Sequence, residues 1–332
     1  MAIAEPVAVL GAGSWGTALA IQLARNDSPV RLWGHDPALI EQLAQTRENS
    51  KYLPGFKLAS NIDPQTSLAA AVADCKFLLV AIPSKGFRDL LQDLKPLLDD
   101  DMALFWASKG FEIDTGMLLH EVVDQELPRH HYGVISGPTF ATEVARGLPA
   151  AIACAGNHAP TTAAFAERLR GHHFRAYTSE DIVGVELGGA LKNVLAIAVG
   201  VADGLGFGAN TRAALMTRGL SEIMRLGTSL GAHQETMMGL AGLGDIILTC
   251  TDNQSRNRRF GLAIGQGKSV AEAEIEVEQT VEGLRAAKAI HSKAIQLGLD
   301  LPIIEEVYRV LYDGKNPHDA VRDLEKRPQG DE

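Results

Sequence analysis

Short apolar runs alternate with stretches of helical periodicity along the first half of the chain. The apolar run Val7–Leu10 leads through a glycine-rich turn into a helical pattern at residues 17–25, and residues 77–82 form a continuous apolar run. Such a continuous run is expected of a strand that is covered on both faces. The alternation predicts an α/β fold built on a doubly wound parallel sheet. Further strands are expected at residues 30–33, 102–107 and 132–135, and further helices at residues 37–47, 90–98 and 117–123.

The pattern changes near Asp181. From Val183 onward the chain shows helical periodicity and almost no strand signal. We therefore expect an α/β domain over residues 1–182 and an all-helical domain over residues 183–332. No Pro/Ser-rich linker marks the boundary, so the two domains should share a helix. Helices are expected at residues 181–200, 211–230, 256–265, 270–274, 281–298 and 303–314, with a polar tail after Lys326.

The turn after the first strand reads Gly11-Ala-Gly13-Ser14-Trp15-Gly16 and opens a helix, which is the context that a dinucleotide-binding turn requires. The first glycine permits the tight turn, the second lets a pyrophosphate approach the backbone, and the third lets the helix pack on the strand. The helix N-terminus then presents N–H groups and a partial positive charge to the phosphates. The pattern predicts a Rossmann dinucleotide-binding domain.

The residue that faces the adenosine ribose of the dinucleotide helps to decide between NAD and NADP. An acid about 20 residues beyond the turn usually holds the ribose 2′-OH of NAD, and Asp36 stands there. Asp36 before Pro37 is equally typical of a helix N-cap followed by proline at the first helical position. In that case His35, or less readily Arg31, faces the ribose, and His35 could accept a 2′-phosphate. We favour NADP (NADPH), with NAD also accepted.

The carboxyl ends of the predicted strands supply further candidates, because ligands of open parallel sheets bind there. Pro83 follows one strand and could wall off the nicotinamide. Lys109 lies between a buried strand and a glycine, which places an ammonium at the mouth of the crevice, although a solvated surface lysine is the alternative. Residues 136–141 offer backbone N–H groups and a hydroxyl at the end of the next strand.

Lys192 lies in segment 185–200, which is apolar almost all round and predicts a central, buried helix. A charge there is costly unless it is paired or neutralised. Burial lowers the pKa of a lysine from about 10.4, which makes the amine a proton donor and acceptor near neutrality. The alternatives are a lysine that reaches the surface or one that pairs with Glu186. The neighbouring Asn193, which we include among the substrate contacts, and the glycines at 188 and 189 favour catalysis.

Two glycine-rich segments of the second half carry different expectations. Segment 239–245 ends in Asp245, whose carboxylate either caps a helix or partners a cation, and the local pattern leaves both open. Segment 204–208 follows a helix and is interpreted as a turn rather than a second nucleotide site.

Residues 252–259 hold the densest positive charge of the chain. Ser255 is typical of an N-cap, which places Arg256 and Asn257 in the first turn of a helix. The helix dipole disfavours arginine there, but a bound phosphate reverses the argument because guanidinium, amide and N–H groups converge on it. Arg258 and Arg259 are interpreted as a solvated basic face.

The composition is that of an ordinary globular protein and excludes several function classes. Of 332 residues 46% are hydrophobic and 22% charged, and a net charge of -10 makes the chain a poor binder of polyanions. We expect no nucleic acid partner, although a small phosphorylated ligand needs only a local cluster of cations. No apolar run approaches the roughly twenty residues that span a bilayer, and no export signal is evident. Three widely separated cysteines argue against disulfides and a metal site and for a cytoplasmic location.

Together these residues resemble the bacterial-type NAD(P)-dependent sn-glycerol-3-phosphate dehydrogenases. The motifs GAGSWGTALA, ISGPTFA, GVELGGALKNV, GFGANTRAA, GLAGLGD and TCTDNQSRNRRFG stand in that family's order and spacing. The resemblance implies an N-terminal Rossmann domain followed by an all-helical domain of the 6-phosphogluconate dehydrogenase-like kind. It also implies reversible reduction of dihydroxyacetone phosphate to sn-glycerol 3-phosphate, which supplies glycerophospholipid biosynthesis.

The resemblance further implies roles for individual residues. Lys192 is the implied proton donor and acceptor. At Thr280 the family commonly has an aliphatic residue, a difference that a backbone contact would tolerate. Implied substrate contacts are Lys109, Gly137, Thr139, Asp245, Ser255, Arg256 and Asn257. Implied cofactor contacts are Ser14, Trp15, His35, Lys109, Ala141, Arg256, Thr280 and Glu282.

The residues themselves support a mechanism of the same kind. Hydride passes to the C2 carbonyl, and negative charge grows on the carbonyl oxygen. Lys192 donates a proton to that oxygen, Lys109 stabilises the oxyanion, and Asp245 orients or tunes Lys192. The helix start at Ser255, Arg256 and Asn257 anchors the phosphate.

Two other classes share part of this pattern. A β-hydroxyacid dehydrogenase would have the glycine turn and the helical lysine but would not need the cationic cluster at residues 255–259. A non-catalytic nicotinamide sensor would need the first domain but gives no reason to bury Lys192 near Asp245. Homodimerisation through the helical domain is compatible with the sequence, which says nothing further about oligomeric state.

Overall fold

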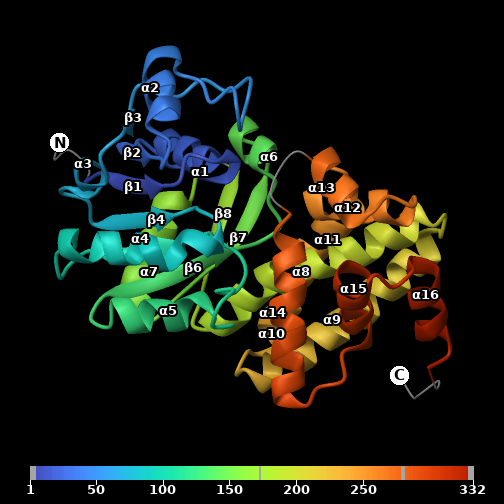
Figure 1. The fold of residues 1–332 in the computed structure, drawn as a ribbon. Coiled ribbons are helices and arrows are strands. Elements are labelled where there is room, and N and C mark those ends of the chain that lie inside the picture. Colours follow the sequence, from blue (N-terminus) through green and yellow to red (C-terminus); the bar gives the residue numbers. More distant parts are fainter. Residues whose placement is uncertain (1–4, 172, 278–280, 328–332) are drawn as a thin grey trace. The chain divides into compact units, whose positions relative to one another are not determined.

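The computed structural model describes residues 5–171, 173–277 and 281–327, and the chain divides into two compact units (Figure 1). Unit 1 comprises Met1–Glu112 and Met117–Glu186, and unit 2 comprises Ile113–Gly116 and Leu187–Glu332. The boundary expected at residues 182/183 lies at the start of a long helix, α8 (Ile182–Gly204). Unit 1 continues through the first turn of α8 to Glu186, so this helix belongs to both units.

Unit 1 is built around a sheet whose described part has eight strands in the order β3-β2-β1-β4-β5-β6-β7-β8 (Figure 1). The doubly wound, Rossmann-type parallel sheet is confirmed, and all pairs among the predicted strands are parallel. One pair departs from this pattern, because β6 and the unpredicted β7 run antiparallel. The strands are β1 (Val7–Leu10), β2 (Val30–Trp33), β3 (Ile62–Gln65), β4 (Phe77–Val80), β5 (Ala103–Trp106), β6 (His131–Ser136), β7 (Ala150–Gly156) and β8 (Phe174–Ser179).

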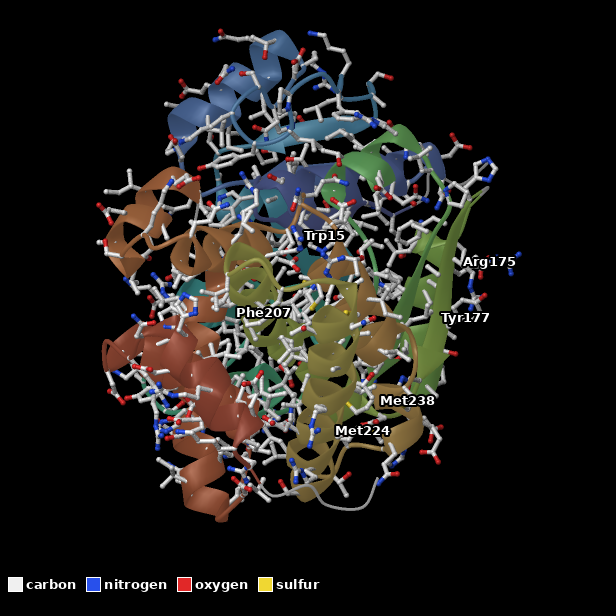
Figure 2. All side chains as sticks on the ribbon, turned by 90° about the vertical axis from the view of Figure 1, so that its right-hand side faces the viewer. Trp15, Arg175, Tyr177, Phe207, Met224 and Met238 are labelled. Atoms are coloured by element: carbon white, nitrogen blue, oxygen red, sulfur yellow. The ribbon has the colours of Figure 1, made fainter. Side chains whose placement is uncertain are left out.

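Three of these strands, β3, β7 and β8, were not predicted. β7 consists mainly of alanine, which carries little of the β-branched and aromatic signal by which strands are recognised. β8 lies at the end of the strand order, and Figure 2 shows Arg175 and Tyr177 pointing away from it into solvent. The connection from β6 to β7 holds only the six-residue helix α6 (Ala141–Arg146), and antiparallel neighbours need no long crossover.

The central strands of unit 1 are buried on both faces. Every residue of β1, β4 and β5 is buried, and the rings of Phe77, Phe105 and Phe165 pack against one another in the core. The parallel pairing of β1 with β4 and of β4 with β5 places the carboxyl ends of these strands side by side. The other helices of unit 1 are α1 (Ser14–Arg25), α2 (Pro37–Thr46), α3 (Leu68–Val72), η1 (Ser84–Gly86), α4 (Phe87–Leu94), η2 (Lys95–Leu97), α5 (Leu119–Glu126) and α7 (Ala159–Leu169).

Unit 2 is helical in its described part, as predicted, and the helix expected at residues 256–265 has those bounds in the structure. A Cβ atom at Gly200 would lie 2.2 Å from the carbonyl oxygen of Arg258, so the backbones of α8 and α12 approach one another in a way that only glycine permits. The helices that follow α8 are α9 (Ala209–Ser229), α10 (Gln234–Met237), the π-helical turn η3 (Leu240–Gly244), α11 (Asp245–Thr251), α12 (Arg256–Gly265), α13 (Val270–Val277), α14 (Glu282–Leu297), α15 (Pro302–Tyr312) and α16 (Pro317–Glu325).

Helix α8 corrects one expectation from the sequence. By length and composition it could cross a membrane, although the sequence was thought to hold no apolar run of that kind. Of its most apolar window, 83% is buried inside the protein. A core helix of this length therefore accounts for its hydropathy without a bilayer.

Candidate active site

The glycine turn of unit 1 has the geometry that a dinucleotide needs. Gly11 has φ +131, and a Cβ atom there would lie 2.5 Å from the carbonyl oxygen of Ala81. A Cβ atom at Gly16 would lie 1.8 Å from the carbonyl oxygen of Gly11, whereas a Cβ atom at Gly13 would meet nothing within 4 Å apart from its chain neighbours. Two glycines thus permit the turn, and the third leaves open space beside the start of α1. These residues fit the pyrophosphate of a nicotinamide dinucleotide.

The loop after α2 is attached to this turn. Ser14 Oγ donates a hydrogen bond of 2.6 Å to the carbonyl oxygen of Tyr52. The side-chain amide of Asn49, which is fully buried, donates to the carbonyl oxygen of Ala12 at 2.9 Å and to Thr17 Oγ1 at 2.8 Å. Asn49 was not among the predicted site residues, because a single asparagine in a loop carries no local signal for a contact with a turn 37 residues away. Trp15 is half-buried on α1.

At the end of β2 the structure assigns Asp36 to the helix cap. Its Oδ1 atom accepts hydrogen bonds from the backbone N–H groups of Ala38 at 3.1 Å and Leu39 at 3.3 Å. His35 is exposed beside it. Arg31 instead donates to the carbonyl oxygens of Ala70 and Ala73 around α3, which leaves it a poor candidate for the ribose.

The other candidates of unit 1 follow neighbouring strands of the sheet. Pro83 comes after β4, Lys109 after β5, and Gly137 after β6. The Oγ atom of Ser108 donates a hydrogen bond of 2.6 Å to the carbonyl oxygen of Ile82, which joins the ends of β4 and β5. Since β1, β4, β5 and β6 are successive neighbours, these residues and the glycine turn share one edge of the sheet.

The last strand end in this series is followed by a tight loop. A Cβ atom at Gly137 would lie 2.8 Å from the carbonyl oxygen of Ala151, and Thr139 Oγ1 donates to the carbonyl oxygen of Gly137 at 3.2 Å. Ala141 is the first residue of α6. The loop therefore places the start of α6 close in sequence to the hydroxyl group of Thr139.

Lys192 and Asp245 form a buried pair in unit 2. The Lys192 side chain leaves the middle of α8, and Asp245 is the first residue of α11. Nζ lies 2.5 Å from Oδ1, and only 8% of Lys192 and 0% of Asp245 is exposed. Thr249 Oγ1 donates a further hydrogen bond of 3.2 Å to the same carboxylate oxygen. Of the alternatives left open by the sequence, the structure supports a cation partner for Asp245 and a buried position for Lys192.

Glu186, the other partner considered for Lys192, serves a different purpose. It accepts hydrogen bonds from the backbone N–H groups of Leu119 at 2.7 Å and His120 at 3.3 Å, and lies 2.7 Å from His120 Nδ1. Burial raises the pKa of Glu186, while His120 and the backbone donors oppose the shift. This carboxylate caps α5 within unit 1.

The start of α12 is joined to α8 and α14 by side-chain amides. Asn257 Nδ2 donates to Asn193 Oδ1 at 2.9 Å, and Asn257 Oδ1 accepts from the backbone N–H of Gly283 at 2.9 Å. Asn193 in turn donates to Glu282 at 3.5 Å. Residues expected to contact substrate and cofactor thus form one connected network within unit 2. Thr280, another expected cofactor contact, lies outside the described residues.

The N-cap of α12 matches the prediction, but its basic face does not. Ser255 Oγ accepts from the backbone N–H of Arg258 at 3.2 Å, and Arg256 is half-buried in the first turn. Arg258 was expected to be solvated, yet it is 7% exposed and lies 2.5 Å from Asp203, with Nε donating to the carbonyl oxygen of Cys250 at 3.0 Å. Only Arg259 is exposed as expected. A charge count cannot distinguish a solvated arginine from a paired one.

The cysteines take no part in this chemistry. All three are unpaired and buried, and burial raises the pKa of the Cys250 thiol to about 12 and that of Cys75 to about 11. Their thiolate forms are therefore suppressed at neutral pH. In the described part of the chain no group of three or more His, Cys, Asp or Glu side chains could hold a metal ion.

A Rossmann-type sheet with a dinucleotide turn, followed by a helical unit with a buried lysine–aspartate pair, defines a nicotinamide-dependent oxidoreductase. Comparison with known proteins specifies the family. Residues 6–162 match the family described as NAD-dependent glycerol-3-phosphate dehydrogenase N-terminus, and residues 181–322 match the corresponding C-terminus.

Individual relatives are similar over the full length. The chain is 52% identical over 325 residues to the glycerol-3-phosphate dehydrogenase (NAD(P)+) of Thioalkalivibrio sulfidiphilus, covering 98% of both chains. It is 50% identical over 331 residues to that of Shewanella frigidimarina, covering 99% of this chain and 98% of the relative. The crystal structure of the Coxiella burnetii glycerol-3-phosphate dehydrogenase superposes with a TM-score of 0.95 at 44% identity, covering 98% of this chain and 100% of that one.

The chain therefore belongs to the NAD-dependent glycerol-3-phosphate dehydrogenase family. It is an oxidoreductase that uses NAD or NADP, and its reaction is the reversible reduction of dihydroxyacetone phosphate to sn-glycerol 3-phosphate.

Proposed function

We propose that Lys192 is the proton donor and acceptor of this reaction. The observation that carries the proposal is its burial against Asp245, with 2.5 Å between Nζ and Oδ1. A buried ammonium that is held by one carboxylate has a fixed direction and little competition from water. It can protonate the C2 oxygen when dihydroxyacetone phosphate is reduced and take the proton back in the reverse reaction.

Asp245 is the proposed orienting residue. It holds the ammonium and balances its charge, and Thr249 limits the rotation of the carboxylate through the hydrogen bond to Oδ1. We further propose that Lys109 stabilises negative charge on the substrate oxygen, with Gly137 and Thr139 as additional substrate contacts.

The start of α12 is the proposed phosphate site. Ser255 and the half-buried Arg256 supply a hydroxyl, helix N–H groups and a guanidinium, which together suit a phosphate dianion. Asn257 and Asn193 hold this helix start against α8 through their mutual hydrogen bond of 2.9 Å. In this proposal the side-chain amides of Asn193 and Asn257 position the start of α12 and also contact the substrate.

The cofactor is proposed to bind unit 1 through the glycine turn. When bound, it supplies or accepts the hydride at C2. The glycine turn would hold the pyrophosphate beside Gly13, where the structure leaves open space. Pro83 would border the nicotinamide ring. The proposed contacts are Gly11, Gly13, Ser14, Trp15, Gly16, His35, Pro83, Lys109, Ala141, Arg256, Thr280 and Glu282.

The wider role follows from the product. sn-Glycerol 3-phosphate is a precursor of glycerophospholipids, so we assign the protein to their synthesis in the cytoplasm. We propose that residues 1–182 bind the dinucleotide and that residues 183–332 bind substrate, with no nucleic acid partner and no membrane-spanning segment. The mainly buried surface of α8 supports the last point. Homodimerisation through the helical unit completes the proposal.

One assay tests the function directly. Absorbance of the reduced nicotinamide is followed with purified protein, with dihydroxyacetone phosphate present and absent, and with a non-phosphorylated 3-hydroxyacid in the reverse direction. Oxidation of NADPH or NADH that depends on dihydroxyacetone phosphate is expected. Faster turnover of the 3-hydroxyacid would favour a β-hydroxyacid dehydrogenase, and nucleotide binding without any turnover would favour a sensor.

A further inference from the structure

The loop after α2 places Lys51 near the end of β2. Asn49 and Ser14 attach this loop to the glycine turn through hydrogen bonds of 2.6 to 2.9 Å. Tyr52 is held at both ends of its backbone, because its N–H donates to Asn49 Oδ1 at 3.2 Å and its carbonyl oxygen accepts from Ser14. Lys51 directly precedes Tyr52 and, with Ser50, lies between these anchors. Its position is therefore set by the turn itself.

Lys51 lies beside the acid that would otherwise select NAD. Its Nζ atom is 3.9 Å from Asp36 Oδ2 and 5.0 Å from the centre of the Tyr52 ring. Both partners of the ion pair are about half exposed, with 56% of the lysine side chain and 51% of the aspartate side chain accessible. An ion pair with that exposure is weak, so the ammonium can turn to a ligand with more charge.

Asp36 is poorly suited to the ribose 2′-OH in this arrangement. Its Oδ1 atom already accepts two backbone hydrogen bonds at the start of α2, and its Oδ2 atom faces Lys51. A carboxylate that faced the ribose alone would repel a 2′-phosphate. Here its charge is shared between a helix N-terminus and a lysine, which reduces that repulsion.

The other cations nearby are engaged elsewhere. Between residues 31 and 57, all of which the structure describes, Arg31 donates to carbonyl oxygens around α3 and Arg47 donates to the carbonyl oxygens of Ala59 and Ile62. Lys57 lies 3.0 Å from Glu48. Lys51 is the cation of this segment that is directed to the end of β2.

We propose that Lys51, together with His35, binds the 2′-phosphate of NADP(H) and thereby determines how well the enzyme distinguishes NADP from NAD. The ammonium and imidazole would form charge-assisted hydrogen bonds to the phosphate oxygens, and Asp36 would remain the cap of α2. The inference rests on the proposed dinucleotide site of unit 1 but not on the proposed role of Lys192.

Binding of two fragments to the full chain, measured by calorimetry, tests the proposal without turnover. One fragment is 2′,5′-ADP, which carries the 2′-phosphate, and the other is 5′-AMP, which lacks it. Lys51→Ala is expected to weaken 2′,5′-ADP binding about tenfold and to change 5′-AMP binding less than about twofold. Lys57→Ala, which removes a neighbouring exposed lysine, is the matched control and should change neither affinity.

A second variant is expected to act in the opposite direction. Asp36→Asn keeps a good N-cap but removes the negative charge, so 2′,5′-ADP should bind several-fold more tightly. The ratio of kcat/KM for NADPH to that for NADH should fall in Lys51→Ala and rise in Asp36→Asn. Thermal unfolding of each variant checks that the fold is retained.

Two results would overturn the proposal. Lys51→Ala could leave 2′,5′-ADP binding unchanged, or it could weaken both fragments equally, which would assign the lysine to the loop rather than to the phosphate. If the unaltered protein bound neither fragment, the dinucleotide site itself would be wrong. Loss of turnover with normal fragment binding would count only against the catalytic proposal.

Discussion

The candidate functional residues of unit 1 and those of unit 2 depend on different features of the chain. In unit 1 the dinucleotide turn depends on the backbone, with glycines at 11, 13 and 16 and the N–H groups that begin α1. In unit 2 the chemistry depends on side chains that are far apart in sequence. Lys192 and Asp245 are separated by 53 residues, and Asn193 and Asn257 by 64. A backbone site is encoded in a few adjacent residues, whereas a side-chain site exists only after the helices have packed.

The difference has an energetic consequence. Open space beside Gly13 and the exposed His35 can be altered without disturbing a core, so substitutions there should act on ligand binding. The Lys192–Asp245 pair lies within the apolar core of unit 2, where removing one partner leaves a buried charge. Substitutions there should therefore act on stability and catalysis together.

The largest effect is expected from Lys192→Ala. Loss of a general acid should lower kcat for dihydroxyacetone phosphate by about 10²–10⁴-fold or more. Affinity for NADPH, measured by fluorescence titration, should stay within a few fold, because the proposed dinucleotide turn is in unit 1. Lys268→Ala removes an exposed lysine paired with Glu276 and is the control. Normal turnover of the Lys192 variant would end the proposed mechanism.

Asp245→Ala should combine a catalytic loss with a loss of stability. Removing the carboxylate deprives the buried ammonium of its partner, and unfolding free energy should fall by about 3–5 kcal/mol. Urea denaturation measures the change. The double variant Lys192→Met with Asp245→Leu should regain most of the stability but none of the turnover. If the single variant were as stable as the unaltered protein, the buried ammonium would not need this carboxylate as its partner.

In the glycine turn of unit 1, by contrast, ligand binding and stability should be affected by different substitutions. Gly13→Ala adds a methyl group to open space, so the melting temperature should hardly change while NADPH binding weakens about tenfold. Gly16→Ala places a Cβ atom 1.8 Å from the Gly11 carbonyl oxygen and should instead destabilise the fold. Thermal unfolding and fluorescence titration of the two variants separate these effects. Equal destabilisation by both would contradict the open space beside Gly13.

The last effect depends on pH and concerns a carboxylate that caps a helix in unit 2. Glu222 is 2% exposed and accepts hydrogen bonds from the backbone N–H groups of Ile303 at 2.8 Å and Ile304 at 3.2 Å. Burial raises the pKa of Glu222 from 4.5 to about 7. The folded state therefore binds this proton more tightly than the unfolded state, and its contribution to stability falls as pH rises from about 4.5 to about 7.

Glu222→Gln should remove that part of the pH dependence. Relative to the variant, the unaltered protein should lose stability by on the order of 1 kcal/mol per pH unit within the window from pH 4.5 to 7. Urea denaturation of both proteins at several pH values measures the difference. Parallel stability curves for the two proteins would show that Glu222 does not titrate in this range.

Local patterns predicted much of this molecule. The glycine turn, the buried strands β1, β4 and β5, and the bounds of α12 were accessible because each depends on residues that are adjacent or one helical turn apart. The other predicted helices begin and end within a few residues of the observed bounds, whereas α3, α6, α7, α10, α11 and α16 were not predicted. The patterns failed for β7, which is made of alanine, and for the antiparallel pairing of β6 with β7, because direction is a property of two strands.

The sequence by itself determined the class of this protein, because backbone turns, helical periodicity and the position of a charge within an apolar segment are all local properties. It also identified Lys192 and Asp245 as candidates. Only the tertiary structure decided that these two residues are partners, that Glu186 caps α5, and that Arg258 is buried beside Asp203. The physical reason is that the state of a charge depends on its distance from other charges and from water, and folding sets both distances.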